Sequence, residues 1–292
     1  MIPQEIEVSL KAFLEKEFQF YGPAISYRPV GGGCINYAME VRTAAGSFFL
    51  KYNDARAFPG MFDAEKKGLI LLGGAHELKV PGVIHTAISG NYSYILMEFI
   101  TSAPEIPDFM EDFGRSLAKL HMHHDHLFGM DHDNFMGSLP QSNRFHPGWV
   151  TFFIEERLET QVRLAEGKGL LPADTRKQFE RLYTLLPGIL PAELPSLLHG
   201  DLWGGNYMIS GEGKACLIDP AVYYGHREID LAMSRLFGGF GEAFYRCYQE
   251  SFPLEHGWEE RVGVYNLYPL LVHLNLFGSS YLGQIKSVLR KF

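Results

Sequence analysis

Cysteine and long apolar runs are scarce in this chain of 292 residues. Its three cysteines, Cys34, Cys216 and Cys247, form no C-x-x-C pair, so the sequence predicts neither a zinc site nor a disulfide framework. A reduced, cytoplasmic setting is the simplest expectation. No apolar run approaches the ~20 residues that span a bilayer, and the N-terminus has no basic segment followed by an apolar one, so we expect no signal peptide and no membrane partner.

Positive charge is also limited. The chain has 26 Lys and Arg against 34 Asp and Glu, for a formal net charge of -8, and it contains no basic run. Nucleic-acid binding needs a basic stripe or patch, so we expect no nucleic-acid partner. Hydrophobic residues make up 46% of the chain, and a protein of this length can bury a sizeable core without disulfides. The oligomeric state is left open.

The first hundred residues predict a small, strand-rich lobe. Helical spacing of apolar residues predicts a helix over 5–18, and alternation predicts strands that are separated by glycine turns. The expected strands cover 25–30, 35–42, 47–52, 80–84 and 92–100, with a second helix over 63–72. The first turn is Gly31-Gly32-Gly33.

A proline-containing linker over 102–107 then leads into a helix-rich part. Helices are expected over 109–124, 149–167, 173–186 (ended by Pro187), 228–237, 241–251 and 259–277, with a loop over 199–207 and a short strand over 216–218. The sequence therefore predicts an α+β chain with an N-lobe over 1–101 and a larger, mainly helical C-lobe over 102–292. A cleft between two lobes is a usual ligand site.

One segment combines the residue types that phosphoryl transfer needs. It reads His199-Gly200-Asp201-Leu202-Trp203-Gly204-Gly205-Asn206, and Leu217-Ile218-Asp219 follows. Transfer to an alcohol needs a carboxylate that accepts the hydroxyl proton and oxygen ligands that hold Mg²⁺ against a triphosphate. Asp201 suits the first task, and Asn206 and Asp219 suit the second. Each residue alone has an ordinary explanation as a turn, cap or strand end, but their joint spacing favours catalysis.

The predicted N-lobe contains residues that suit a nucleotide. A glycine turn lets backbone N–H groups approach phosphates, although a hairpin turn alone also favours glycine. Lys51 ends an apolar strand and Glu65 lies on the next helix, an arrangement that grips α- and β-phosphates. Taken singly, both are ordinary surface charges. The backbone of Met97, Glu98 and Phe99, just before the linker, is the candidate contact for adenine.

In protein kinases the same spacing occurs in H-R-D-x-x-x-x-N, followed by D-F-G. The whole chain resembles the fructosamine kinase (ketosamine-3-kinase) family, relatives of aminoglycoside phosphotransferases and choline kinases with a protein-kinase-like fold. The most specific motif is HGDLWGGN, because Trp203 separates this family from the wider group. Further matches are Asp219-Pro220-Ala221, 224–232 (YGHREIDLA), Phe128-Gly129, 133–137 (DNFMG), Trp149, Phe152-Phe153, Arg157 and 267–278 (LYPLLVHLNLFG).

The resemblance implies ATP- and Mg²⁺-dependent phosphorylation of the sugar of a ketoamine, such as a glycated amine or lysine. In that family, phosphorylation at the third sugar carbon makes the adduct fall apart, which is deglycation repair. By the same resemblance, Asp201 is the proton acceptor, Asn206 and Asp219 are metal ligands, and Lys51 with Glu65 holds phosphate. Trp203 and His273 are candidate substrate contacts.

Four alternatives stay open. The chain could be a kinase of an aminoglycoside or of choline, or a nucleotide-binding scaffold without catalysis. The histidines of 121–126 and His132 could share a metal, or simply interact with carbonyls at a helix end. Cys34, beside the glycine turn, could be a redox-sensitive thiol or an inert packed residue.

Overall fold

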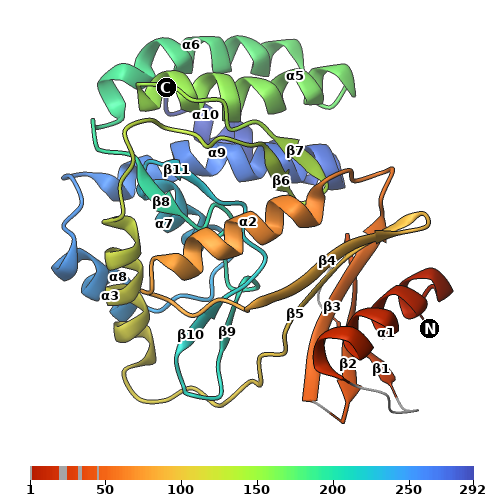
Figure 1. Ribbon diagram of the computed structural model, residues 1–292. Coiled ribbons are helices and arrows are strands. Elements are labelled where there is room, and N and C mark those ends of the chain that lie inside the picture. Colours follow the sequence, from red (N-terminus) through yellow and green to blue (C-terminus); the bar gives the residue numbers. More distant parts are fainter. Residues whose placement is uncertain (1, 20–24, 32–34, 45) are drawn as a thin grey trace.

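The computed structural model describes residues 2–19, 25–31, 35–44 and 46–292, and it places an antiparallel sheet beside a larger helical part (Figure 1). The five strands of the sheet lie in the order β1-β2-β3-β5-β4. Their bounds are β1 (Ser26–Pro29), β2 (Tyr37–Thr43), β3 (Gly46–Asp54), β4 (Val83–Ser89) and β5 (Tyr92–Glu98). The predicted α+β class is confirmed.

Two helices cover opposite faces of this sheet. The helix α1 (Gln4–Phe18) packs on the face that carries Leu50 and Tyr52, and α2 (Met61–Gly74) packs on the face that carries Ile95 and Met97. Successive residues of a strand point to opposite faces. Lys51, between Leu50 and Tyr52, therefore points toward α2, which carries Glu65.

The helical part encloses the largest hydrophobic core. In Figure 1, α5, α6, α9 and α10 gather at the top, and α3 lies against α8 at the left. Its elements are α3 (Phe109–His121), α4 (Trp149–Phe152), the π-helix η1 (Phe153–Glu159), α5 (Thr160–Gly167), α6 (Ala173–Ile189), α7 (Glu228–Leu236), α8 (Glu242–Ser251), α9 (Trp258–Phe277), the 3₁₀-helix η2 (Ser279–Tyr281) and α10 (Leu282–Leu289).

The described residues also form three antiparallel pairs of short strands. They are β6 (Asn134–Met136) with β7 (Leu139–Gln141), β8 (Ser196–Leu198) with β11 (Tyr223–Gly225), and β9 (Tyr207–Ile209) with β10 (Ala215–Leu217). The segment 199–206 connects β8 to β9, and 218–222 connects β10 to β11. Because β9 pairs with β10, these two loops lie close together.

Several predicted boundaries were wrong. The strand expected over 80–84 is Val83–Ser89, and the helix expected over 109–124 ends at His121. Pro187 lies inside α6, which continues to Ile189. A proline in the last turn removes one hydrogen bond near an end that frays anyway, so the helix tolerates it. The expected boundary between residues 101 and 102 falls in the connection from β5 to α3. No helix in the described part of the chain is long and apolar enough to cross a membrane.

Candidate active site

The loop between β8 and β9 brings Asp201 and Asn206 together, as the sequence predicted. The Asn206 amide Nδ2 donates to the Asp201 backbone carbonyl and to the Asp201 carboxylate Oδ2, both at 2.9 Å. The loop is closed by the Asn206 N–H, which donates to the carbonyl of Trp203 at 2.9 Å. This arrangement fixes the Asp201 carboxylate and leaves the oxygen of the Asn206 amide for another ligand.

The start of this loop is anchored by Asp230 on α7. One Asp230 oxygen accepts the backbone N–H of His199 at 2.8 Å, and the other accepts that of Gly200 at 2.9 Å. The buried His121 ring lies 3.3 Å from the same carboxylate. Asp230 is itself buried. A buried carboxylate with two charge-assisted hydrogen bonds holds the backbone before Asp201 firmly in place.

Gly200 has no room for a side chain. Its φ is +82°, and a Cβ there would lie 2.0 Å from the carbonyl oxygen of Ala221. The Ala221 N–H also donates to the His199 carbonyl at 2.9 Å. The glycine thus lets the loop that carries Asp201 pack directly on the segment that follows Asp219.

Lys51 joins the two parts of the molecule. Its Nζ lies 2.6 Å from Glu65 Oε1 and also contacts the Asp219 carboxylate, 168 residues away in the sequence. Burial lowers the pKa of Lys51, but the charges of Glu65 and Asp219 outweigh this effect and raise that pKa above its ordinary value. The ammonium is therefore charged at neutral pH. Asp219 has a left-handed backbone (φ 54°), which aspartate tolerates better than most residues.

Asp201 lies in an environment that suits a proton acceptor. Burial raises the pKa of its carboxyl to about 7, the hydrogen bond from Asn206 opposes that rise, and the charges of Asp219 and Asp230 add to it. A base whose pKa lies near the working pH can take a proton and release it again. Raised carboxyl pKa values are common at catalytic sites.

The remaining nucleotide residues are described only in part. Gly31 has open space around it, and Gly32, Gly33 and Cys34 lie outside the described residues. Met97 is buried on the α2 side of the sheet. The Glu98 N–H donates to the Gly82 carbonyl at 2.8 Å.

The two expected substrate residues, Trp203 and His273, are connected through contacts between aromatic rings. Trp203 is 37% exposed and its ring lies over Gly205, where a Cβ would come within 2.3 Å of it. The Trp203 ring contacts Phe237, with centroids 6.0 Å apart, and Phe237 contacts His273 at 4.8 Å. Trp203 and His273 therefore belong to one surface, although 70 residues separate them.

The histidines at the end of α3 and after it do not gather at one point. His121 is buried and its Nδ1 pairs with the Tyr248 hydroxyl at 2.8 Å. The His123 ring lies near Glu77, that of His124 near the Pro195 carbonyl, and that of His132 beside Asp131. These four rings face different partners, and the described residues place no group of metal ligands here, which argues against a shared metal.

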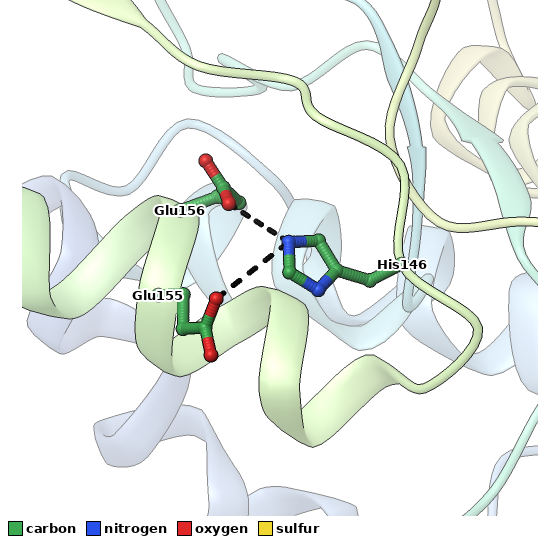
Figure 2. Close-up of side chains that lie close together, drawn as sticks. All are labelled: His146, Glu155 and Glu156. Atoms are coloured by element: carbon green, nitrogen blue, oxygen red, sulfur yellow. Dashed lines mark hydrogen bonds and ion pairs between the residues drawn. The ribbon is translucent and has the colours of Figure 1, made fainter.

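Another group has the composition of a metal site. The His146 ring faces Glu155 and Glu156, which both lie on η1 (Figure 2). Its Nε2 is 2.8 Å from Glu156 Oε1 and 4.0 Å from Glu155 Oε2. However, the Arg144 guanidinium lies 2.7 Å from Glu156 Oε1 and 3.3 Å from Glu155 Oε2. Arg144 already supplies the positive charge that a metal would bring, so we assign this group to structure.

Comparison with known proteins decides the family. A family model described as fructosamine kinase matches residues 4–292. The chain belongs to the fructosamine kinase family. It is therefore a phosphotransferase, and the predicted family and enzyme class are confirmed.

The relatives of this fructosamine kinase family member cover nearly its whole length. A probable ketoamine kinase of Enterococcus faecium is 40% identical over 266 residues, which are 90% of this chain and 94% of the relative. A chloroplastic protein-ribulosamine 3-kinase of Arabidopsis thaliana is 39% identical, over 89% of this chain and 80% of the relative.

Solved structures confirm the kinase-like fold. A putative fructosamine-3-kinase of Haemophilus somnus superimposes with a TM-score of 0.88 at 29% identity, over 99% of this chain and 98% of that one. A spectinomycin phosphotransferase, solved with ADP and spectinomycin, has a TM-score of 0.60 at 14% identity, over 98% and 93% of the two chains. The second likeness shows the shared fold alone.

Sequence reasoning missed the role of Asp230. In the sequence, the run 224–232 is only a family match, and nothing in its local pattern says that a helix residue accepts hydrogen bonds from a loop about 30 positions earlier. Its one signal was an aspartate among apolar residues on a helix that is otherwise expected to be buried, a place where a charge needs partners.

Proposed function

We propose that this protein phosphorylates a sugar hydroxyl of a ketoamine with ATP, and that its role is the removal of glycation adducts. One observation carries the proposal: the Lys51–Asp219 pair lies beside the Asp201–Asn206 pair, because the Ile218 N–H donates to the Asn206 carbonyl at 3.0 Å, and this occurs in a member of the fructosamine kinase family. The relatives named ketoamine kinase and protein-ribulosamine 3-kinase support this substrate class.

Asp201 acts as the base in this proposal. The acceptor hydroxyl donates a hydrogen bond to the Asp201 carboxylate, which takes the proton as the oxygen bonds to the terminal phosphorus of ATP. The bond from that phosphorus to its bridging oxygen breaks, and ADP leaves. Asn206 keeps the carboxylate in position, with its amide 2.9 Å from Oδ2. Asp230 holds the backbone of the loop and acts only through it.

Asn206 and Asp219 fit a divalent metal. An amide oxygen and a carboxylate are the hard oxygen donors that Mg²⁺ prefers. When bound, Mg²⁺ supplies positive charge against the phosphates. Lys51 now shares the Asp219 carboxylate, and it would contact the α- and β-phosphates while Glu65 holds its ammonium. Activity is expected to disappear with EDTA and to return with Mg²⁺.

Adenine is assigned to the connection after β5. Met97 is buried and the Glu98 N–H is paired with Gly82, so Met97 and the Glu98 N–H are poor contacts. The Glu98 carbonyl and the backbone from Phe99 onward are the better candidates for its hydrogen-bonding edge. Gly31, Gly32 and Gly33 would approach the phosphates.

The acceptor is assigned to Trp203 and His273. Trp203 lies two residues after Asp201, so its ring can pack on the apolar face of a sugar. Trp203→Ala is expected to raise the KM for the acceptor more than the KM for ATP.

The deciding experiment is a panel of acceptors with the purified protein and Mg²⁺·ATP. It includes fructose- and ribulose-modified amines, kanamycin and choline, with product phosphorylated at the third sugar carbon identified by NMR. Ketoamines are expected to be the preferred acceptors. A strong preference for kanamycin or choline would overturn the substrate class, and no turnover with any acceptor would favour a nucleotide-binding scaffold.

A further inference from the structure

A row of aromatic side chains begins two residues after the candidate base and crosses the helical part. It consists of Trp203, Phe237, His273, Phe277 and Tyr281, and we call it the aromatic row. Neighbouring centroids lie 6.0 Å (Trp203–Phe237), 4.8 Å (Phe237–His273), 5.4 Å (His273–Phe277) and 5.1 Å (His273–Tyr281) apart. The row brings together the catalytic loop, the end of α7, the end of α9 and η2.

The row faces solvent to an unusual degree. Trp203 is 37% exposed, Phe237 41% and Phe277 54%. Isolated exposed apolar residues are ordinary, but a contiguous group is typical of a binding surface. Arginines stack on rings elsewhere, as Arg235 does on Tyr245 and Trp258. No such cation–π contact involves the row within the part of the chain that the structure describes, so no cation of the protein itself competes for these rings.

The loop that carries Phe237 is fixed beside the catalytic loop. A Cβ on Gly204 would lie 3.0 Å from the Gly238 carbonyl oxygen, so the two backbones are nearly in contact. The Tyr207 hydroxyl donates to the Gly239 carbonyl at 2.9 Å. Phe237 is thus held next to the ring that lies two residues after the base.

His273 gives the row a hydrogen-bond acceptor. Its Nδ1 lies 2.7 Å from the Pro269 carbonyl, which can only accept, so Nδ1 carries the proton and Nε2 offers a lone pair. Burial lowers the pKa of His273, with the Pro269 carbonyl opposing it. A neutral imidazole does not repel a cation.

We propose that the aromatic row binds the amine-bearing half of the acceptor. It selects secondary ammonium groups whose nitrogen carries an aromatic or extended substituent. This inference rests on the proposed ketoamine substrate, which has a hydroxylated sugar at one end and a protonated amine at the other. With a sugar hydroxyl at Asp201, the amine extends over the row. Ring faces attract an ammonium group, the His273 Nε2 accepts one of its hydrogens, and Phe237 and Phe277 pack on its substituent.

The test compares two fructose adducts, one of methylamine and one of benzylamine, in steady-state kinetics at saturating Mg²⁺·ATP. Phe237→Ala is expected to raise the KM for the benzylamine adduct by about 5- to 10-fold, the order expected for one lost ring contact. The KM for the methylamine adduct should change by less than about twofold, the KM for ATP should not change, and Phe237→Tyr should restore the wild-type values. Phe145→Ala removes another exposed phenylalanine (45% exposed) and serves as the matched control.

The charge of the ligand is tested separately. A fructose derivative with a benzyl ether oxygen in place of the nitrogen keeps the ring and loses the ammonium, so its KM with the wild-type protein should be about 3- to 30-fold higher. An equal KM for the ether and the amine would overturn the ammonium preference.

The outcomes separate this inference from the function on which it rests. If no ketoamine is phosphorylated, the proposed function fails. If both adducts are phosphorylated and Phe237→Ala changes their KM values equally or not at all, only the role of the row fails. Should Phe237→Ala not fold, Phe277→Ala decides in its place, because the Phe277 side chain is more exposed and its loss should shift the same KM in the same direction.

Discussion

Replacing the candidate base should make the protein more stable while it destroys activity. Asp201→Asn keeps the shape of the side chain and removes its charge, and the Asn206 amide can still donate to the new carbonyl oxygen. Turnover is expected to fall about 10²- to 10⁴-fold, the usual contribution of a positioned base. The gain in stability arises because folding buries this carboxylate near two others, those of Asp219 and Asp230.

The size of the gain follows from the pKa of Asp201. Folding raises it from 3.8 to about 7, and three pH units at 1.36 kcal/mol each set an upper limit of about 4 kcal/mol. Asp201 is only partly buried, so we expect about 1–3 kcal/mol. Between pH 4 and 7 the folded wild type holds a proton that the unfolded chain has released, so its free energy of unfolding falls as the pH rises. The advantage of Asp201→Asn is therefore absent below pH 4, grows up to pH 7 and is constant above it.

The assay is urea unfolding of the wild type and Asp201→Asn at pH 5 and pH 8, with EDTA and without nucleotide. Asp112→Asn, on the exposed part of α3, is the control and should lie within about 0.5 kcal/mol of the wild type at both pH values. The variant's advantage should be larger at pH 8 than at pH 5. The same difference at both pH values would refute the raised pKa, and a variant less stable than the wild type at pH 8 would refute the burial argument itself.

Three further substitutions test the supports of the site. Asp230→Asn should lower the free energy of unfolding by about 3 kcal/mol in urea unfolding, because one buried N–H loses its acceptor, and an unchanged value would contradict the anchoring role. Gly200→Ala should cost at least about 2 kcal/mol, from the left-handed backbone and the clash with the Ala221 carbonyl, and a neutral effect in thermal unfolding would show that the segment can move. Lys51→Met should raise the KM for ATP about 10-fold or more, with little change in the KM for the acceptor, because it removes the ammonium that Glu65 and Asp219 hold. Equal changes in both KM values would argue against a phosphate contact.

Much of the site could be predicted from local sequence because its residues act over short spacings. Asp201 and Asn206 lie in one loop, so their separation of five residues already limits how far apart their side chains can be. The strand alternation around Lys51 indicates which face it occupies, and the helix after it supplies Glu65. These relations depend on backbone periodicity, which the sequence encodes directly.

The tertiary structure decided what depends on distant segments. Only the packing of α7 under the catalytic loop makes Asp230 the acceptor of two backbone N–H groups. Only the approach of the sheet to the β10–β11 loop joins Lys51 to Asp219, and only the meeting of α7 and α9 aligns Phe237 with His273. The raised pKa of Asp201 has the same origin, since desolvation and nearby charge depend on which atoms surround a group in space and not on its neighbours in the chain.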